Sequence, residues 1–145
     1  MRSDLLMGGM VSLLNFGIHA LMTALIIVCT RHTELRTRDV SIFVRIAALL
    51  TVAVTFLMMA HITEISVWGG TLHWLGIGIS NINSFEFAFE NYTTLGYGDA
   101  LPTDRAYRLI GPMMALNGLL LIGWSVAVIF EVMRMAEFQV GDGDS

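Results

Sequence analysis

The stretch Thr93-Thr94-Leu95-Gly96-Tyr97-Gly98-Asp99 decides what kind of protein this chain forms. Its glycines stand at alternate positions, where they allow the backbone to enter the left-handed region at no steric cost. A backbone that alternates in this way turns its carbonyl oxygens to one side, and the Thr94 hydroxyl adds one more oxygen. Leu95 and Tyr97 then turn away to pack against the wall behind. The stretch therefore predicts a row of oxygens that can replace the water around a dehydrated cation.

The segments around this stretch favour that interpretation over an ordinary glycine turn that contains a tyrosine. The chain has 145 residues, of which 55% are hydrophobic and 14% charged, whereas soluble domains carry about 25% charged residues. Three apolar stretches, 5–29, 40–68 and 107–135, exceed the length of about 20 residues that crosses a bilayer. The stretch 83–93 is too short to cross and ends at the motif, which is typical of a re-entrant helix. We therefore predict an all-α membrane protein.

We divide the chain into four predicted parts. They are an additional N-terminal transmembrane helix (1–30), a basic loop (31–39), a pore module (40–135) and a short tail (136–145). Within the pore module we expect an outer helix (40–68), an outer loop (69–82), a re-entrant helix (83–93), the oxygen row (94–99) and an inner helix (106–135). A cleaved signal peptide is the less favoured interpretation of 1–30, because Asn15 and His19 interrupt its apolar run.

The arginines predict the orientation of the chain in the membrane. The loop 31–39 holds the densest set of arginines, and Arg45 follows it closely. Short loops rich in arginine stay in the cytoplasm. The N-terminus is then outside, the segment 83–99 enters the membrane from outside, and the C-terminus is cytoplasmic.

The motif and its neighbours resemble the bacterial two-helix pore potassium channels, the group also described as ion channel or two-pore-type. The resemblance covers residues 40–135 and is carried by TLGYGD at 94–99, with Pro102, Arg108 and Gly118 at matching positions. It implies a potassium channel in which four identical chains surround one pore. It also implies that the carbonyl groups of the filter bind K⁺, at Thr94, Leu95, Gly96, Tyr97 and Gly98.

The chain departs from that family in the re-entrant helix. Well-studied members carry two tryptophans that brace the filter, and this chain has Glu86 and Phe87 there. Phe87 cannot donate a hydrogen bond, so we expect Asn91 to be the partner of the Tyr97 hydroxyl. The departure bears on selectivity at low potassium and on inactivation of the filter, and not on conduction.

Two carboxylates flank the motif, Glu90 before it and Asp99 at its end. The resemblance implies that they lie together behind the filter. Two carboxylates in contact do not both ionise cheaply, so we expect the pair to share a proton. The alternative is that both face extracellular water.

The predicted inner helix contains the candidate gate. Gly118 is a candidate hinge and Pro112 a candidate bend, although both residues could equally serve packing. Helical spacing from Gly118 predicts a pore-facing row of Leu119, Ile122, Val126 and Phe130. A ring of Phe130 side chains would close the pore by dewetting, and the alternative is that Phe130 faces lipid or a packed interface.

Polar residues inside the predicted spans are a further group of candidates. Glu64 is a functional candidate because ionisable groups are costly in a bilayer; the alternative is that it lies in water at a helix end. His19 is interpreted as a polar residue satisfied between helices. His61 and Glu64 could present two metal ligands on one helix face, but no further ligand lies near them in the sequence.

The main functional hypothesis is a channel that conducts potassium passively and selectively. The alternatives are a weakly selective cation channel, and a non-conducting membrane subunit or scaffold that keeps the pore fold. We expect no catalytic residues, no enzyme activity, no cofactor other than the permeant K⁺ and no nucleic acid. The expected partners are three identical subunits and the lipid bilayer, and a separate regulatory subunit is one possible source of gating. The expected location is the plasma (inner) membrane.

Overall fold

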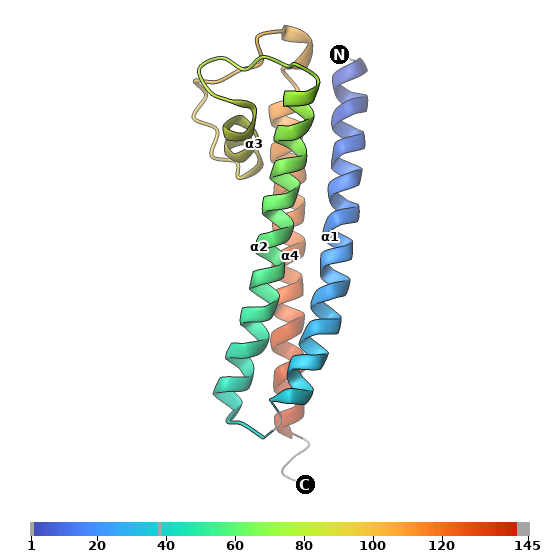
Figure 1. Cartoon of the computed structure of the whole chain (residues 1–145), viewed down its shortest axis with the longest axis vertical. Coiled ribbons are helices and arrows are strands. Elements are labelled where there is room, and N and C mark those ends of the chain that lie inside the picture. Colours follow the sequence, from blue (N-terminus) through green and yellow to red (C-terminus); the bar gives the residue numbers. More distant parts are fainter. Residues whose placement is uncertain (1, 38, 142–145) are drawn as a thin grey trace.

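Three long helices run side by side, and a short helix packs against them near one end (Figure 1). The computed structural model describes residues 2–37 and 39–141. The long helices are α1 (Arg2–Arg36), α2 (Ile42–Trp74) and α4 (Ile110–Gly141). The short helix α3 (Ser84–Tyr92) and the 3₁₀ turn η1 (Arg105–Tyr107) come between α2 and α4 in the chain. The beginning of α1 lies at the same end as α3, and the α1–α2 connection lies at the other end (Figure 1).

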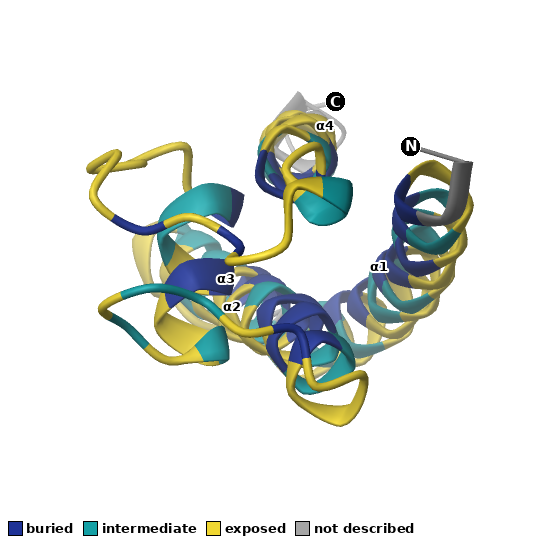
Figure 2. Ribbon diagram, turned by 90° about the horizontal axis from the view of Figure 1, so that it is seen from above, coloured by how far each residue is buried: buried dark blue, intermediate teal, exposed yellow. Residues whose placement is uncertain are grey.

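All three long helices are long and apolar enough to cross a membrane. Helix α1 has 35 residues, and at that length it extends about 50 Å, well beyond a hydrocarbon core of about 30 Å. Buried residues line the faces that the long helices turn toward one another, and exposed residues cover the outside (Figure 2). Many of the exposed residues are large and apolar, such as Leu13, Phe43 and Phe130. The prediction of an all-α membrane protein is confirmed.

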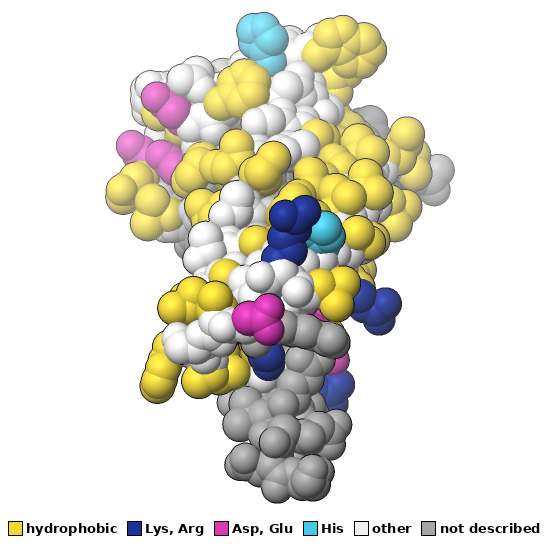
Figure 3. Space-filling view, turned by 60° about the horizontal axis from the view of Figure 1, so that its bottom comes forward, with side chains coloured by type: hydrophobic (Ala, Val, Ile, Leu, Met, Phe, Trp, Pro, Cys, Tyr) yellow, Lys and Arg dark blue, Asp and Glu magenta, His cyan; other side chains and the backbone are white. Residues whose placement is uncertain are grey.

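The basic segment at the α1–α2 connection is more helical than predicted. Helix α1 continues through Arg36, so the loop expected at 31–39 begins inside the helix; Arg38 lies outside the described residues. Residues 31–36 contain no glycine or proline that would end a helix, and Arg36 Nε donates to His32 Nε2 at 3.1 Å. At the same end, Arg45 Nη2 donates to the carbonyl of Ala136 at 3.3 Å, and Figure 3 shows basic side chains there among apolar ones.

Helix α2 runs six residues past its predicted end at 68, so the predicted outer loop 69–82 begins too early. The predicted outer loop begins at Gly69. A Cβ at Gly69 would lie 2.6 Å from Phe85 Cδ1, so this glycine admits a close contact with α3 and does not end the helix. The helix ends where Gly76 adopts a φ of 65°. Ile77 N then donates to Leu72 O at 3.0 Å and Gly76 N to His73 O at 3.1 Å, which is a Schellman motif.

Helix α3 begins at a capping box. The Asn83 side chain accepts hydrogen bonds from the backbone N–H groups of Phe85 and Glu86, each at 2.9 Å. Glu86 Oε2 in turn accepts from Asn83 N at 3.1 Å. This reciprocal pair satisfies N–H groups that a nine-residue helix would otherwise leave exposed at its start.

Replacing the cap residue should loosen α3. We expect Asn83→Ala to lower the free energy of unfolding by about 1 kcal/mol, the usual cost of removing an N-cap side chain. The check is the thermal unfolding midpoint of the purified protein in detergent. Asn83→Ser, which keeps a capping oxygen, should stay close to the wild type. Equal midpoints for Asn83→Ala and Asn83→Ser would contradict this role.

Helix α4 begins at Ile110 and continues to Gly141, whereas we predicted an inner helix at 106–135 and a tail at 136–145. Nothing between 136 and 140 breaks a helix, and the first glycine there is Gly141. Residues 142–145 of the predicted tail lie outside the described residues. Pro112 occupies the first turn of α4, where its missing N–H has no intrahelical partner to lose. Pro112 therefore fits its position without bending the helix.

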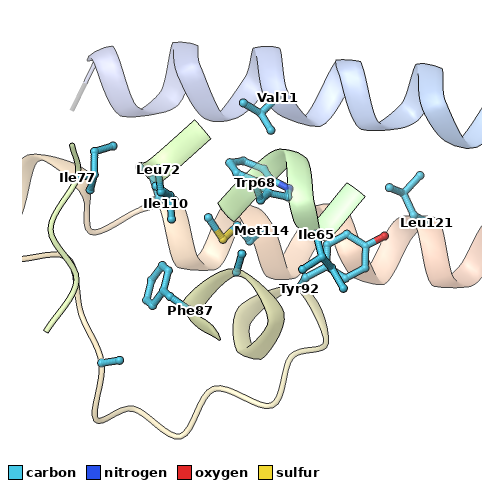
Figure 4. Close-up of a cluster of buried hydrophobic side chains, with 12 residues drawn as sticks. Val11, Ile65, Trp68, Leu72, Ile77, Phe87, Tyr92, Ile110, Met114 and Leu121 are labelled. Carbon is cyan, nitrogen blue, oxygen red and sulfur yellow. The ribbon is translucent and has the colours of Figure 1, made fainter. Parts of the chain in front are cut away.

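The interior consists of two apolar clusters separated by polar residues. The cluster near α3 includes Trp68, Phe87, Tyr92, Met114 and Leu121 and is drawn in Figure 4. The second cluster, toward the α1–α2 connection, is formed around Ile26, Leu49, Leu57, Val128 and Val132. The polar residues Asn15, His19, Glu64, Asn117 and Ser125 are buried as well.

Candidate functional site

The backbone between α3 and η1 has positive φ at every second residue of the motif. The values are 60° at Thr94, 43° at Gly96 and 81° at Gly98. Positive φ is unusual for a β-branched residue such as Thr94, so the surrounding structure must hold it there. Leu95 N and Gly96 N both donate to the carbonyl of Glu90, at 2.9 and 3.2 Å. These two hydrogen bonds to the end of α3 thus hold the backbone conformation at the start of the motif.

The far end of the motif is held by the loop that follows α2. Asn81 Nδ2 donates to Asp99 O at 2.9 Å. Ser80 N donates to Leu101 O at 3.0 Å, and Thr103 N donates to Gly78 O at 2.9 Å. The motif is therefore anchored at both ends to elements that pack against α2.

The side chains of the motif are open to the surroundings in the single chain. Leu95 is 56% exposed and Tyr97 71% exposed, so the same chain does not supply the wall behind them, and this packing stays a prediction for an assembly. The predicted bond between Asn91 and Tyr97 is not formed within one chain and stays a prediction for an assembly of several chains. Asn91 Nδ2 donates instead to Phe87 O at 2.8 Å, and the Tyr97 hydroxyl bonds to none of the described residues. The reason is geometric: Asn91 points along α3 toward α4, where its Oδ1 lies against Gly111.

Glu90 and Asp99 do not form a carboxylate pair within one chain. Glu90 borders a cavity of about 170 Å³ behind the motif, together with Arg108. Asp99 is exposed and does not line this cavity. Across the described residues no hydrogen bond joins the two carboxyl groups, so the shared proton stays a prediction for an assembly of several chains.

Helices α3 and α4 approach each other closely at Gly118. A Cβ at this position would lie 2.0 Å from the carbonyl oxygen of Tyr92. The contact requires glycine for packing alone, and a hinge at Gly118 stays a prediction. Farther along α4, the neighbouring Leu120 and Trp124 are exposed in the single chain, and so is the predicted pore-facing row. The row comprises Leu119 (58% exposed), Ile122 (39%), Val126 (63%) and Phe130 (68%).

A polar junction joins α1, α2, α3 and α4 next to the Tyr92 end of the large apolar cluster. We define it as His19, His61, Glu64, Tyr92 and Ser125. His19 Nδ1 lies 2.8 Å from Glu64 Oε1, and His61 Nδ1 lies 3.2 Å from Glu64 Oε2. The Tyr92 hydroxyl donates to Glu64 Oε2. Glu64 is fully buried, which excludes the alternative that it lies in water at a helix end.

Beside the junction, two buried asparagines bridge the long helices. Asn117 Oδ1 accepts from Trp68 Nε1 and from Asn15 Nδ2, each at 3.0 Å. Asn15 Nδ2 also lies 3.3 Å from Glu64 O. Sequence reasoning did not assign a role to Tyr92, Ser125 or Asn117. The signal available was that polar residues recur on facing helices at spacings of three, four and eight, which places each set on one helical face.

Comparison with known protein families identifies the family of this chain. Residues 60–135 match the sequence model of a family described as ion channel. The match covers just over half of the chain and contains α3, the motif and most of α4. This chain belongs to the ion channel family. No curated protein and no solved structure matches it.

The matched range divides the polar junction of this ion channel. His61, Glu64, Tyr92 and Ser125 fall within it, whereas His19 and the whole of α1 precede it. The family consists of channels and not of enzymes, and with three candidate spans the protein is a multi-pass membrane channel. The polar junction is therefore one of the places where residues of the matched range contact α1.

Proposed function

We propose that this ion channel conducts K⁺ selectively, with residues 94–98 as its filter. The observation that carries the proposal is the positive φ at Thr94, Gly96 and Gly98. Alternation of this kind turns successive carbonyl groups to the same side, and a ring of such oxygens can replace the hydration shell of K⁺. The Thr94 hydroxyl would add the innermost oxygen. K⁺ would then bind at Thr94, Leu95, Gly96 and Tyr97.

A closed ring of oxygens requires several copies of the chain, and we propose a tetramer with cyclic symmetry. The exposure of the motif and of the predicted pore-facing row on α4 supports this assembly. Two groups of side chains are open in the single chain: Leu95 and Tyr97 in the motif, and Leu119, Ile122, Val126 and Phe130 on α4. An assembly would cover Leu95 and Tyr97 and would leave the α4 residues to line the pore. Neighbouring chains would also supply partners for the Tyr97 hydroxyl and the Asp99 carboxyl group.

Helix α3 would act as the pore helix. Its C-terminal end leads directly into the motif at Thr93, and a helix C-terminus carries about half a negative charge. That partial charge favours a cation in the cavity below the filter. We place the N-terminus and α3 at the extracellular side of the plasma membrane and the arginine-rich α1–α2 end in the cytoplasm. The predicted pore-facing row on α4, with Phe130 near its cytoplasmic end, is our candidate for the gate.

A weakly selective cation channel is the second candidate. It is favoured by one observation, the missing brace of the filter. Phe87 is buried and carries no donor, and Asn91 is engaged with the Phe87 carbonyl. A filter without hydrogen bonds behind Tyr97 would widen more easily, and a wider filter would accept Na⁺.

Reversal potentials under a potassium–sodium gradient distinguish these candidates. The purified protein is reconstituted in planar bilayers, and Gly96→Ala serves as the control that disturbs the motif. We expect a reversal close to the potassium equilibrium potential, and we expect the variant to lose it. A reversal near zero in the wild type would establish the weakly selective pore. No current under any pH or voltage, in tetramers that show no ordered ions at residues 94–98, would favour the scaffold.

A further inference from the structure

Three side chains that can bind a metal meet where α1 packs against α2. His61 and Glu64 are one turn apart on α2, and His19 comes from α1. One ring nitrogen of His19, one ring nitrogen of His61 and a carboxylate oxygen of Glu64 all lie within 4.8 Å of one another. His61 and Glu64 were candidate ligands from their spacing, and His19 supplies the third ligand that the sequence around them lacks. We propose that His19, His61 and Glu64 bind a divalent metal ion of the zinc class, with the Tyr92 hydroxyl as the fourth ligand.

The distances suit such an ion. In a tetrahedral site, with bonds of about 2.0–2.1 Å, neighbouring ligand atoms are about 3.3 Å apart. The separations here are 2.8 Å between His19 Nδ1 and Glu64 Oε1, and 3.2 Å between His61 Nδ1 and Glu64 Oε2. The Tyr92 hydroxyl lies 2.8 Å from His61 Nδ1 and contacts the same carboxylate. Small side-chain shifts would therefore place an ion among the four side chains, and two imidazoles with a carboxylate are a common zinc ligand set.

Ser125 holds the two imidazoles by their other nitrogens. Its hydroxyl oxygen lies 2.9 Å from His61 Nε2 and 3.4 Å from His19 Nε2. Metal-binding histidines generally donate the N–H that faces away from the metal to an oxygen, which fixes the ring orientation. One buried serine on α4 thus orients both histidines toward Glu64.

Counting protons favours an additional positive charge at the junction. If both neutral rings carry their hydrogen on Nδ1 and donate it to Glu64, both Nε2 atoms are acceptors. The single Ser125 hydroxyl hydrogen can serve only one of them, so one contact would join two acceptors. With a metal at the Nδ1 atoms, both rings carry their hydrogen on Nε2 and donate it to Ser125. An extra proton on one ring would satisfy the same contacts without a metal, and the experiment below separates these two states.

The side chains of the proposed site are largely buried, so its net charge matters. His19 and Glu64 have fully buried side chains, and the His61 side chain is 17% exposed. One divalent ion and one carboxylate leave a single positive charge, which loss of the Tyr92 proton on coordination would neutralise. The ion would link α1, α2 and α3, so it would fasten the additional helix to the end of α3 that carries the motif. The proposal is independent of potassium selectivity.

Zinc binding by the whole protein tests this directly. The chain is purified in detergent with a tag that contains no histidine, stripped with a chelator and dialysed against buffered ZnCl₂. We expect the wild type to retain about one zinc per chain by elemental mass spectrometry. His19→Gln, which can still form a hydrogen bond but is a poor zinc ligand, should weaken binding by at least ~10-fold. His73→Gln changes an exposed histidine outside the junction and should bind as the wild type does.

A rescue variant separates a metal site from a hydrogen-bonded cluster. His19→Cys places a thiolate ligand in the same position, and Co²⁺ then replaces Zn²⁺ as the probe. We expect a sulfur-to-cobalt charge-transfer band that the wild type lacks, since Cys29 is present in both proteins. Equal zinc content in the wild type and His19→Gln would overturn the proposal, and so would the absence of this band in folded His19→Cys.

Discussion

We expect Gly118→Ala to lower the free energy of unfolding more than the other glycine-to-alanine substitutions proposed for this protein. The added Cβ would lie 2.0 Å from the Tyr92 carbonyl oxygen and 2.9 Å from its carbonyl carbon. These are backbone atoms at the end of α3, so a rotamer change cannot relieve the contact. Helix α3 would have to move away from α4, and it would take the start of the motif with it. Overpacking typically costs 1–3 kcal/mol, and we expect a value of about 3 kcal/mol or more because backbone must move.

The measurement is the thermal unfolding midpoint, together with the fraction of folded protein in size-exclusion chromatography. Gly123→Ala is the matched control, because it adds the same methyl group to the same helix with nothing within 4 Å of the new Cβ. Alanine is the better helix former, so this control should be neutral or stabilising by up to about 1 kcal/mol. Similar midpoints for the two variants would show that the α3–α4 contact is not as close as described.

The second large effect is expected from Gly98→Ala, which should abolish selective potassium current. Gly98 has a φ of 81°, and its Cβ position is open, so the cost of alanine comes from the backbone alone. Left-handed backbone costs an L-residue roughly 1–2 kcal/mol. In the proposed tetramer this cost applies to every chain of the ring, so the motif should leave its alternating conformation. The reversal potential under a potassium–sodium gradient is the readout.

Gly76→Ala is the matched control for this second variant. Gly76 also has a positive φ, 65°, and an open Cβ position, but it ends α2 outside the motif. The same strain should therefore lower stability by roughly 1–2 kcal/mol and leave the reversal potential unchanged. If Gly98→Ala remains selective while the protein stays folded, residues 94–98 are not the filter.

Features that depend on neighbouring residues were largely readable from the sequence. The glycines of the motif indicated positive φ at Gly96 and Gly98, and the structure has it at both positions. The capping box at Asn83 and Glu86 likewise involves only residues three apart. The predicted end of α2 at 68 was wrong, because the helix continues through Gly69 to Trp74. The reason for a glycine at position 69 is Phe85, which lies sixteen positions later in the chain.

The amino-acid sequence was sufficient to identify a membrane protein with three spans and a short segment that ends in a glycine motif. Composition and local backbone chemistry are sufficient for that. Only the tertiary structure showed that His19 meets Glu64 across 45 positions, and that Gly118 meets Tyr92. The cause is the lipid that surrounds a spanning helix. Lipid tails are as apolar as leucine, so a spanning helix is apolar on every side, and its pattern does not reveal which face another helix covers.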